Sequence, residues 1–255
     1  MAAMDLGLRD RVYIVTGGSS GLGRATAEAL VAEGARVVVS SRSAEGVDAA
    51  VAALGEEFAT GVVADNADPS TPATLIAGAH DSFGRLDGAL VSVGGPPTGS
   101  VMTTSDDDWR SSFEAVFLGA VRLGTAVGKA LDGGGSLLFV LSTSVRQPIG
   151  GLAISNGLRP GLAMVAKTLA DELGPAGVRV NGLLPGRVDT ARVRSLDALS
   201  DDPEATRKAA TASIPLRRYG RPTEFGATAA FLLSPAAGYV TGAMVPVDGG
   251  LTRAL

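Results

Sequence analysis

The chain has 255 residues, with 22 lysines and arginines against 26 acidic residues, one histidine and no cysteine. Without cysteine it has no disulfide scaffold, thiolate zinc site or cysteine nucleophile, and with His80 alone it has no site built from two histidines, so no metal site is expected. A net charge of −4 without Lys/Arg-rich blocks argues against nucleic acid and against basic membrane-surface binding.

The amino-terminal segment is not expected to act as a targeting signal. Residues 1–11 lack the apolar stretch of a signal peptide, and no run approaches the roughly 18 apolar residues of a membrane span. We therefore expect a soluble cytoplasmic protein.

Short β-rich runs alternate with longer Ala/Leu-rich amphipathic segments along the entire chain. Such apolar runs suit strands that are buried on both faces, and the intervals are long enough for crossover helices. The pattern predicts one α/β domain over residues 1–255, with a mostly parallel, doubly wound sheet and helices on both faces. The expected strands are Val12–Thr16, Arg36–Ser40, Gly61–Ala64, Ala89–Val93, Ser136–Leu141, Val178–Leu184 and Ala243–Val247.

The segments between these runs predict helices. Pro160 removes an amide donor and would clash with the carbonyl of Asn156 unless it lies in a first turn, so the helix in that region is expected to begin near Pro160. The predicted helices cover Leu22–Glu33, Ala44–Leu54, Pro72–Phe83, Asp106–Leu131, Leu162–Leu173 and Pro222–Leu233.

A glycine-rich loop joins the first strand to the first helix. It reads Thr-Gly-Gly-Ser-Ser-Gly-Leu-Gly over residues 16–23, inside a strand–turn–helix–strand unit of about 30 residues. Glycines allow the sharp turn and the close approach of a pyrophosphate, and the helix amino terminus favours negative charge. The loop predicts dinucleotide binding, and the alternative is a turn that binds nothing. The residues expected to bind the dinucleotide are Gly17, Ser19, Ser20, Gly21, Leu22 and Gly23.

The second strand ends in Ser41 and Arg42, where an NAD-binding protein usually has an acid that meets the ribose hydroxyls. Arg42 is suited to a 2′-phosphate, so NADP(H) is preferred over NAD(H), which stays possible; Arg42 as a solvated helix-start residue is the alternative. After the third strand, Asp65 and Asn66 are placed to bind an adenine amino group or to form a simple turn.

The polar interval Thr190–Arg221 breaks the strand–helix rhythm directly after the sixth strand. Ligands of open α/β sheets lie at the carboxyl ends of the strands. Residues 190–221 are therefore expected to form a substrate flap, or else a plain surface excursion.

Beyond this point the chain resembles the short-chain dehydrogenase/reductase family over nearly its full length. The resemblance rests on the glycine loop, on Pro185-Gly186-Arg187-Val188-Asp189-Thr190, and on the ending from Gly220-Arg221-Pro222 to Val247-Asp248-Gly249-Gly250. It implies a seven-stranded Rossmann sheet and a homotetramer or homodimer. It also implies that the cofactor is held by Val91, Val93, Gly94, Arg159, Pro185, Gly186, Val188 and Thr190.

The family's catalytic positions depart from its pattern. Its Ser falls on Ser142, but its Tyr falls on Ser155, its Lys on Arg159 and its Asn on Val116. A serine hydroxyl is a much poorer proton donor than a phenol, and an arginine still clamps ribose or a carboxylate. Together with Gly94-Gly95-Pro96-Pro97, these positions resemble a divergent branch of 3-oxoacyl-carrier-protein reductase-like proteins.

Two functions follow from this pattern. The first is an NADP-preferring oxidoreductase acting on a small-molecule carbonyl or alcohol, with Ser142, Ser155 and Arg159 as the catalytic residues. The second is a dinucleotide-binding protein without turnover, acting as a sensor or a structural subunit. Tyr219, at the end of the flap interval, is a further candidate acid, while Tyr13 and Tyr239 are expected to pack.

Overall fold

A parallel sheet of aliphatic strands organises the computed structural model, which describes residues 5–131 and 133–254. Within these residues the sheet has seven strands in the order β3-β2-β1-β4-β5-β6-β7, and every neighbouring pair is parallel. This confirms the Rossmann-type, doubly wound α/β fold. The strands are β1 (Val12–Thr16), β2 (Arg36–Ser41), β3 (Ala59–Val63), β4 (Gly88–Val91), β5 (Gly135–Val140), β6 (Val178–Pro185) and β7 (Met244–Val247).

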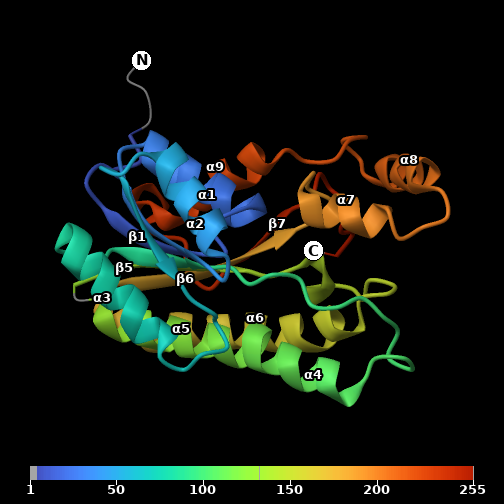
Figure 1. The fold of residues 1–255 in the computed structure, drawn as a ribbon, viewed down its shortest axis with the longest axis horizontal. Coiled ribbons are helices and arrows are strands. Elements are labelled where there is room, and N and C mark those ends of the chain that lie inside the picture. Colours follow the sequence, from blue (N-terminus) through green and yellow to red (C-terminus); the bar gives the residue numbers. More distant parts are fainter. Residues whose placement is uncertain (1–4, 132, 255) are drawn as a thin grey trace.

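Helices cover both faces of the sheet. Figure 1 shows α1, α2 and α9 on one face, α3, α5 and α6 on the other, and α7 and α8 beyond one end of the strands. Their bounds are α1 (Gly21–Ala32), α2 (Ala44–Leu54), α3 (Thr71–Phe83), α4 (Asp106–Ser112), α5 (Gly119–Ala130), α6 (Ala153–Leu173), α7 (Ala191–Asp197), α8 (Pro203–Ser213) and α9 (Pro222–Leu233), with 3₁₀ turns at Thr143–Val145, Gly174–Ala176 and Pro235–Ala237.

Each face of the sheet has its own apolar core, as expected for strands that are buried on both sides. One core joins β-strand residues to α3, α5 and α6 through side chains such as Leu123, Phe139 and Leu162. The other joins them to α1 and α9 through side chains such as Leu30, Leu183 and Phe225. No helix in the described part of the chain is both long and apolar enough to cross a membrane.

The helix expected over Asp106–Leu131 is not uniform. A π-helical turn, Phe113–Leu118, separates α4 from α5. Where the chain returns to α-helix at Gly119, a Cβ would lie 2.1 Å from the carbonyl oxygen of Asn66, so only glycine allows this approach. The tight contact with the loop after β3 accompanies the wider helical turn, a feature that is frequent at functional sites.

The prediction that a helix begins near Pro160 is wrong, because α6 begins at Ala153 and contains Pro160. The Asn156 side chain exchanges two hydrogen bonds with the backbone of Ile149, its amide donating over 2.9 Å and its oxygen accepting over 3.0 Å. Ile154, Ser155 and Arg159 are also buried against the sheet. These contacts hold the first turns helical although proline removes one amide donor.

Candidate active site

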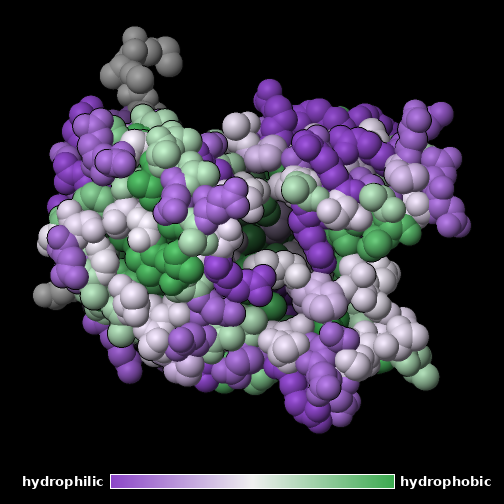
Figure 2. All heavy atoms as spheres, in the orientation of Figure 1, coloured by the Kyte–Doolittle hydropathy of each residue, from purple (hydrophilic) through white to green (hydrophobic). Residues whose placement is uncertain are grey.

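A cleft of about 780 Å³ lies at the carboxyl ends of the strands, between the loops that leave the sheet and helix α7. The hollow is visible in Figure 2, between an upper and a lower lip of the molecule. Almost every residue that the sequence predicted to bind the cofactor lines it: Gly17, Ser19, Ser20, Gly21, Leu22, Gly23, Ser41, Arg42, Asp65, Asn66, Val93, Gly94, Arg159, Pro185, Gly186, Val188 and Thr190.

Val91 is the exception to this set. It is the last residue of β4, its side chain is 1% exposed, and it packs in the core beside α3 and α5. The end of the strand explains the difference, because Val91 is still paired with Phe139 of β5, whereas Ser92 and Val93 follow β4 and line the cleft. The expectation that Val91 borders the cofactor is therefore corrected.

The glycine loop has the geometry that phosphate binding requires. Gly17 and Gly21 adopt positive φ angles of 59° and 56°. A Cβ on Gly23 would lie 2.3 Å from the carbonyl oxygen of Gly17, so a side chain there would push the loop away from the helix. Ser20, the N-cap of α1, makes no capping bond with its side chain, which leaves first-turn amides facing the cleft for an anion.

Strand β1 fixes the position of the loop after β4. The Thr16 hydroxyl donates to the Ser92 carbonyl and accepts from the Ser92 amide, each over 2.8 Å. Thr16 is completely buried, and Ser92 lines the cleft. This reciprocal pair joins the glycine loop to the floor of the cleft.

The end of the cleft that is expected to hold the adenosine lies just beyond the carboxyl end of β2. Arg42 is exposed, and its side chain has no hydrogen bond or ion pair to any described residue. Asp65 lies beside it after β3, where one carboxylate oxygen accepts from the Ala67 amide over 3.0 Å. The turn expected as the alternative for Asp65 is thus present, and its second carboxylate oxygen has no bond among the described residues.

Three serines lie together at the opposite, inner end of the cleft. Ser142 follows β5, and its hydroxyl accepts from the Ser144 amide over 3.0 Å, which leaves its proton free. The Ser155 hydroxyl, on the first turn of α6, lies 3.1 Å from that of Ser144. Ser142 and Ser155 line the cleft, so β5 and α6 bring together two of the hydroxyls that the sequence singled out.

Arg159 lies one turn after Ser155 on the same face of α6 and is only 5% exposed. Its guanidinium donates to the carbonyls of Val140, over 2.5 Å, and Val93, over 3.5 Å. It forms no ion pair with a described residue, and burial lowers its pKa to about 10, so it is charged at neutral pH. An unpaired buried cation is costly and indicates a place for a polar or anionic ligand group.

Val116 also lines the cleft, in the π-helical turn, and is 3% exposed. The resemblance puts the family's relay asparagine here. An isopropyl group neither donates nor accepts hydrogen bonds, so this wall of the cleft is apolar.

The interval Thr190–Arg221 contains two helices, α7 and α8, and α7 forms one wall of the cleft. Asp197, buried at the end of α7, accepts from the Arg187 guanidinium over 2.5 Å and from the Tyr219 hydroxyl over 3.0 Å. Tyr219 does not line the cleft, and burial together with this hydrogen bond raises its pKa. Tyr219 therefore anchors the segment and is not placed to be the missing acid.

Arg192 of α7 is a cleft residue that sequence reasoning missed. Its guanidinium donates to the Pro96 carbonyl over 2.6 Å and covers Gly95, where a Cβ would lie 2.8 Å from Nε. One feature of the sequence could have pointed to Arg192, namely a cation two residues after Thr190 at the start of the expected flap. Its contact with residues 95 and 96 could be recognised only from the folded structure.

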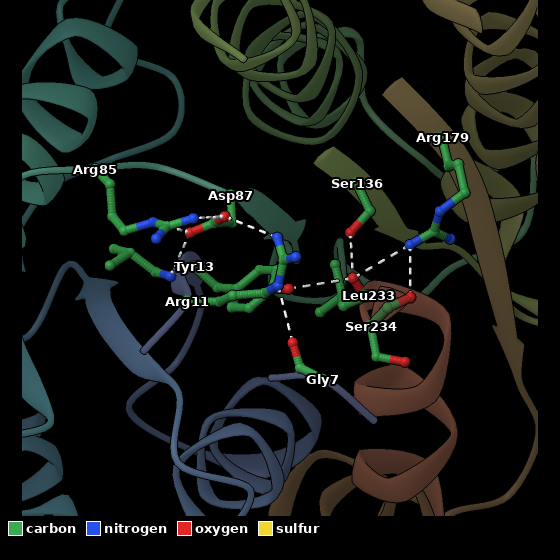
Figure 3. Close-up of polar contacts among 10 residues, drawn as sticks. Gly7, Arg11, Tyr13, Arg85, Asp87, Ser136, Arg179, Leu233 and Ser234 are labelled. Atoms are coloured by element: carbon green, nitrogen blue, oxygen red, sulfur yellow. Dashed lines mark hydrogen bonds and ion pairs between the residues drawn. The ribbon is translucent and has the colours of Figure 1, made fainter. Parts of the chain in front are cut away.

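A second cavity, of about 620 Å³, lies at the amino-terminal edge of the sheet, and its charged groups are engaged in structure. Figure 3 shows Arg11 and Arg85 on the buried carboxylate of Asp87, and Arg179 on the last carbonyls of α9. Ser136 and Tyr13 donate to the Leu233 carbonyl over 2.6 and 3.3 Å. These bonds satisfy the carboxyl terminus of α9.

The fold and the cleft together define a dinucleotide-binding α/β protein with polar groups at the inner end of its cleft. The family model described as enoyl-(acyl carrier protein) reductase matches residues 17–252. The chain belongs to the short-chain dehydrogenase/reductase family of oxidoreductases.

Known relatives cover almost the complete chain. Levodione reductase of Leifsonia aquatica is 36% identical over 259 residues, with 96% of this chain and 95% of the relative covered. Short-chain reductase protein NovJ of Streptomyces niveus is 34% identical over 247 residues, with 95% and 94% covered. Among solved structures, L-sorbose reductase of Gluconobacter frateurii in complex with NADPH and L-sorbose matches with a TM-score of 0.93 and 29% identity, over 99% of this chain and all of that one.

Proposed function

We propose that this chain is an NADP(H)-preferring oxidoreductase that interconverts a small carbonyl compound and its alcohol. The observation that carries the proposal is the convergence of Ser142, Ser155 and Arg159 on the same cleft as the glycine loop. The related L-sorbose reductase, whose structure contains NADPH, supports the choice of cofactor class.

The cleft fits a dinucleotide along its length. The uncapped amides at the start of α1 suit a pyrophosphate, and the Gly23 contact keeps the loop free of side-chain bulk. Arg42, without a protein partner, suits a 2′-phosphate, and a guanidinium meets a phosphate in a bidentate manner. Thr190, Gly186 and Val188 would hold the nicotinamide end.

When bound, the dinucleotide would supply or accept the hydride at the carbonyl carbon of the substrate. The chain positions the carbonyl and handles the proton. Ser142, whose hydroxyl hydrogen is free, would donate a hydrogen bond to the carbonyl oxygen. Ser155 would donate a second hydrogen bond to the same oxygen while its hydroxyl accepts one from Ser144. The positive charge of Arg159 would favour the alkoxide that develops there. A serine hydroxyl would pass its proton to this oxygen, and water would then return a proton to the serine.

The alternative, a dinucleotide-binding protein without turnover, rests on Val116 and Ser155, which replace the relay groups that the family resemblance implies. The test incubates the purified protein and NADPH with ketones, diketones and acyl thioesters, and follows the loss of NADPH absorbance. We expect at least one ketone to be reduced. Tight NADPH binding without consumption at high protein concentration would instead establish the binding protein.

A further inference from the structure

The charged residues of the cleft divide unevenly between its two ends. Among the described residues that line it, the charged ones are Arg42, Asp65, Arg159 and Arg192. Arg42 and Asp65 follow β2 and β3, at one end of the cleft. Arg159 and Arg192 belong to the other end, which has no acidic lining residue in the described part of the chain.

The side chains of both inner arginines contact one short segment of the loop after β4. Arg159 reaches the Val93 carbonyl from the floor, and Arg192 reaches the Pro96 carbonyl from α7. Their protein partners are therefore neutral carbonyls, although each guanidinium can make much stronger bonds to an anion. Neither one forms an ion pair with any described residue.

The position of Arg192 depends on a glycine. Its guanidinium lies against Gly95, where a Cβ would approach Nε to 2.8 Å and Nη2 to 3.1 Å. The neighbouring Arg194 differs, because it points away from the cleft and pairs with Asp189 over 2.9 Å. Helix α7 thus directs one of its two arginines to the mouth of the cleft and the other to solvent.

We propose that the substrate carries a carboxylate, which Arg192 binds at the mouth of the cleft while the charge of Arg159 attracts it from the floor. This inference rests on the proposed function and adds the substrate class, an oxo acid and its hydroxy acid. In reduction, the ketone carbon gains a hydride from NADPH, its oxygen gains a proton from a serine that water replenishes, and NADP⁺ leaves. The carboxylate itself is unchanged and serves as the handle.

The test compares oxo acids with their methyl esters, which keep the ketone and lose the charge: acetoacetate, pyruvate and levulinate. We expect kcat/KM to favour the best acid over its ester by about tenfold or more, and Arg192→Gln to lower that of the acid at least about tenfold while the ester changes less than about threefold. Arg194→Gln, in the same helix, is the matched control and should leave both unchanged. Equal use of acid and ester, or an equal loss on both in Arg192→Gln, would overturn the inference.

Binding separates this inference from the proposed function. Calorimetric titration of the protein saturated with NADP⁺ should give a dissociation constant for the acid about tenfold below that of the ester, a preference lost in Arg192→Gln. Acid binding without turnover would reject the proposed function and keep the carboxylate site, whereas reduction of neutral ketones alone would do the reverse. If neither acid nor ester binds, the site is rejected, and if Arg192→Gln weakens NADPH binding by the same factor as acid binding, Arg192 serves the cofactor phosphate.

Discussion

The hydroxyl oxygens of Ser144 and Ser155 lie 3.1 Å apart, one after β5 and the other on the first turn of α6. Ser144 is buried behind the cleft, whereas Ser155 borders it. The pair therefore fixes the direction of the Ser155 hydroxyl, at the position where the family resemblance implies a tyrosine. Any acid chemistry at this position must use an aliphatic hydroxyl oriented by a second one.

Removal of either cleft hydroxyl should slow turnover. If a ketone is reduced, we expect Ser142→Ala to lower kcat by about tenfold to a hundredfold, because the hydrogen bond to the developing alkoxide is lost. Ser155→Ala should lower kcat less, since Ser144 remains nearby. NADPH affinity, measured by quenching of Trp109, should be unchanged in both variants. Unchanged turnover in both would reject this pair as the catalytic hydroxyls.

Arg42 should set the choice between the two dinucleotides. Arg42→Gln removes a cation that has no protein partner, so folding should be unaffected while the dissociation constant for NADPH rises about tenfold or more. The constant for NADH should stay within about threefold, because NADH lacks the 2′-phosphate. The exposed Arg110→Gln on α4 is the control. Tighter binding of NADH than NADPH by the unaltered protein would contradict the assignment.

Gly23 should tolerate no side chain. In Gly23→Ala the new Cβ would lie 2.3 Å from the Gly17 carbonyl oxygen, so the loop must move and binding of both dinucleotides should fall by about tenfold or more. Gly174→Ala is a matched control, because its Cβ would have no heavy atom within 4 Å. Equal affinities of the two variants, titrated by tryptophan fluorescence, would show that the loop does not bind phosphate.

Asp87 should contribute to stability without contributing to the cleft. Its buried carboxylate accepts from the Arg11 and Arg85 guanidinium groups and from the Val12 amide. Asp87→Ala should lower the free energy of unfolding by about 2–3 kcal/mol, since the Val12 amide loses its partner and the half-exposed arginines lose theirs. Urea denaturation measures this loss. Asp48→Ala, on the exposed side of α2, should stay within about 0.5 kcal/mol.

Alkaline pH should loosen the segment that carries Arg192. Burial and the bond to Asp197 raise the pKa of Tyr219 above its ordinary value of 10.0. The folded protein therefore keeps this proton longer than the unfolded chain, so the stabilisation is complete below about pH 10 and declines as the pH rises through the folded pKa. The fall in Tm above pH 10 should be smaller in Tyr219→Phe. The same substitution at Tyr239, which is fully exposed, should leave the fall unchanged.

Hydrophobic pattern and loop chemistry predicted most of the fold, because strands that are buried on both faces leave continuous apolar runs. The expected strand Val12–Thr16 and the expected helix Ala44–Leu54 match the structure to the residue. Two deviations are tertiary in origin: the π-helical turn at Phe113–Leu118 and the early start of α6 at Ala153. The first accompanies a contact with the distant loop after β3, and the second depends on the bonds between Asn156 and Ile149 and on the burial of Arg159. Local helix propensity encodes neither.

The cleft was predictable where a backbone motif defines it and less so where side chains from separate elements meet. The glycine loop and the segment 185–190 both line the cleft. Arg192 was missed because its importance comes from the loop after β4, nearly a hundred residues earlier in the chain. Val91 was misplaced because it is the last residue of β4 and packs in the core, whereas the cleft begins with the residues that follow the strand.

The strand order β3-β2-β1-β4-β5-β6-β7 has a consequence for how such a protein can change over time. The residues proposed to distinguish NADP(H) from NAD(H) follow β2 and β3, in the first 70 residues, whereas the groups proposed to meet the substrate follow β4–β6. The two selectivities are thus inherited on separate stretches of chain. Substitutions in one stretch can change the cofactor preference without changing the substrate preference. Recombination near β4 can exchange the cofactor-binding half and the substrate-binding half independently.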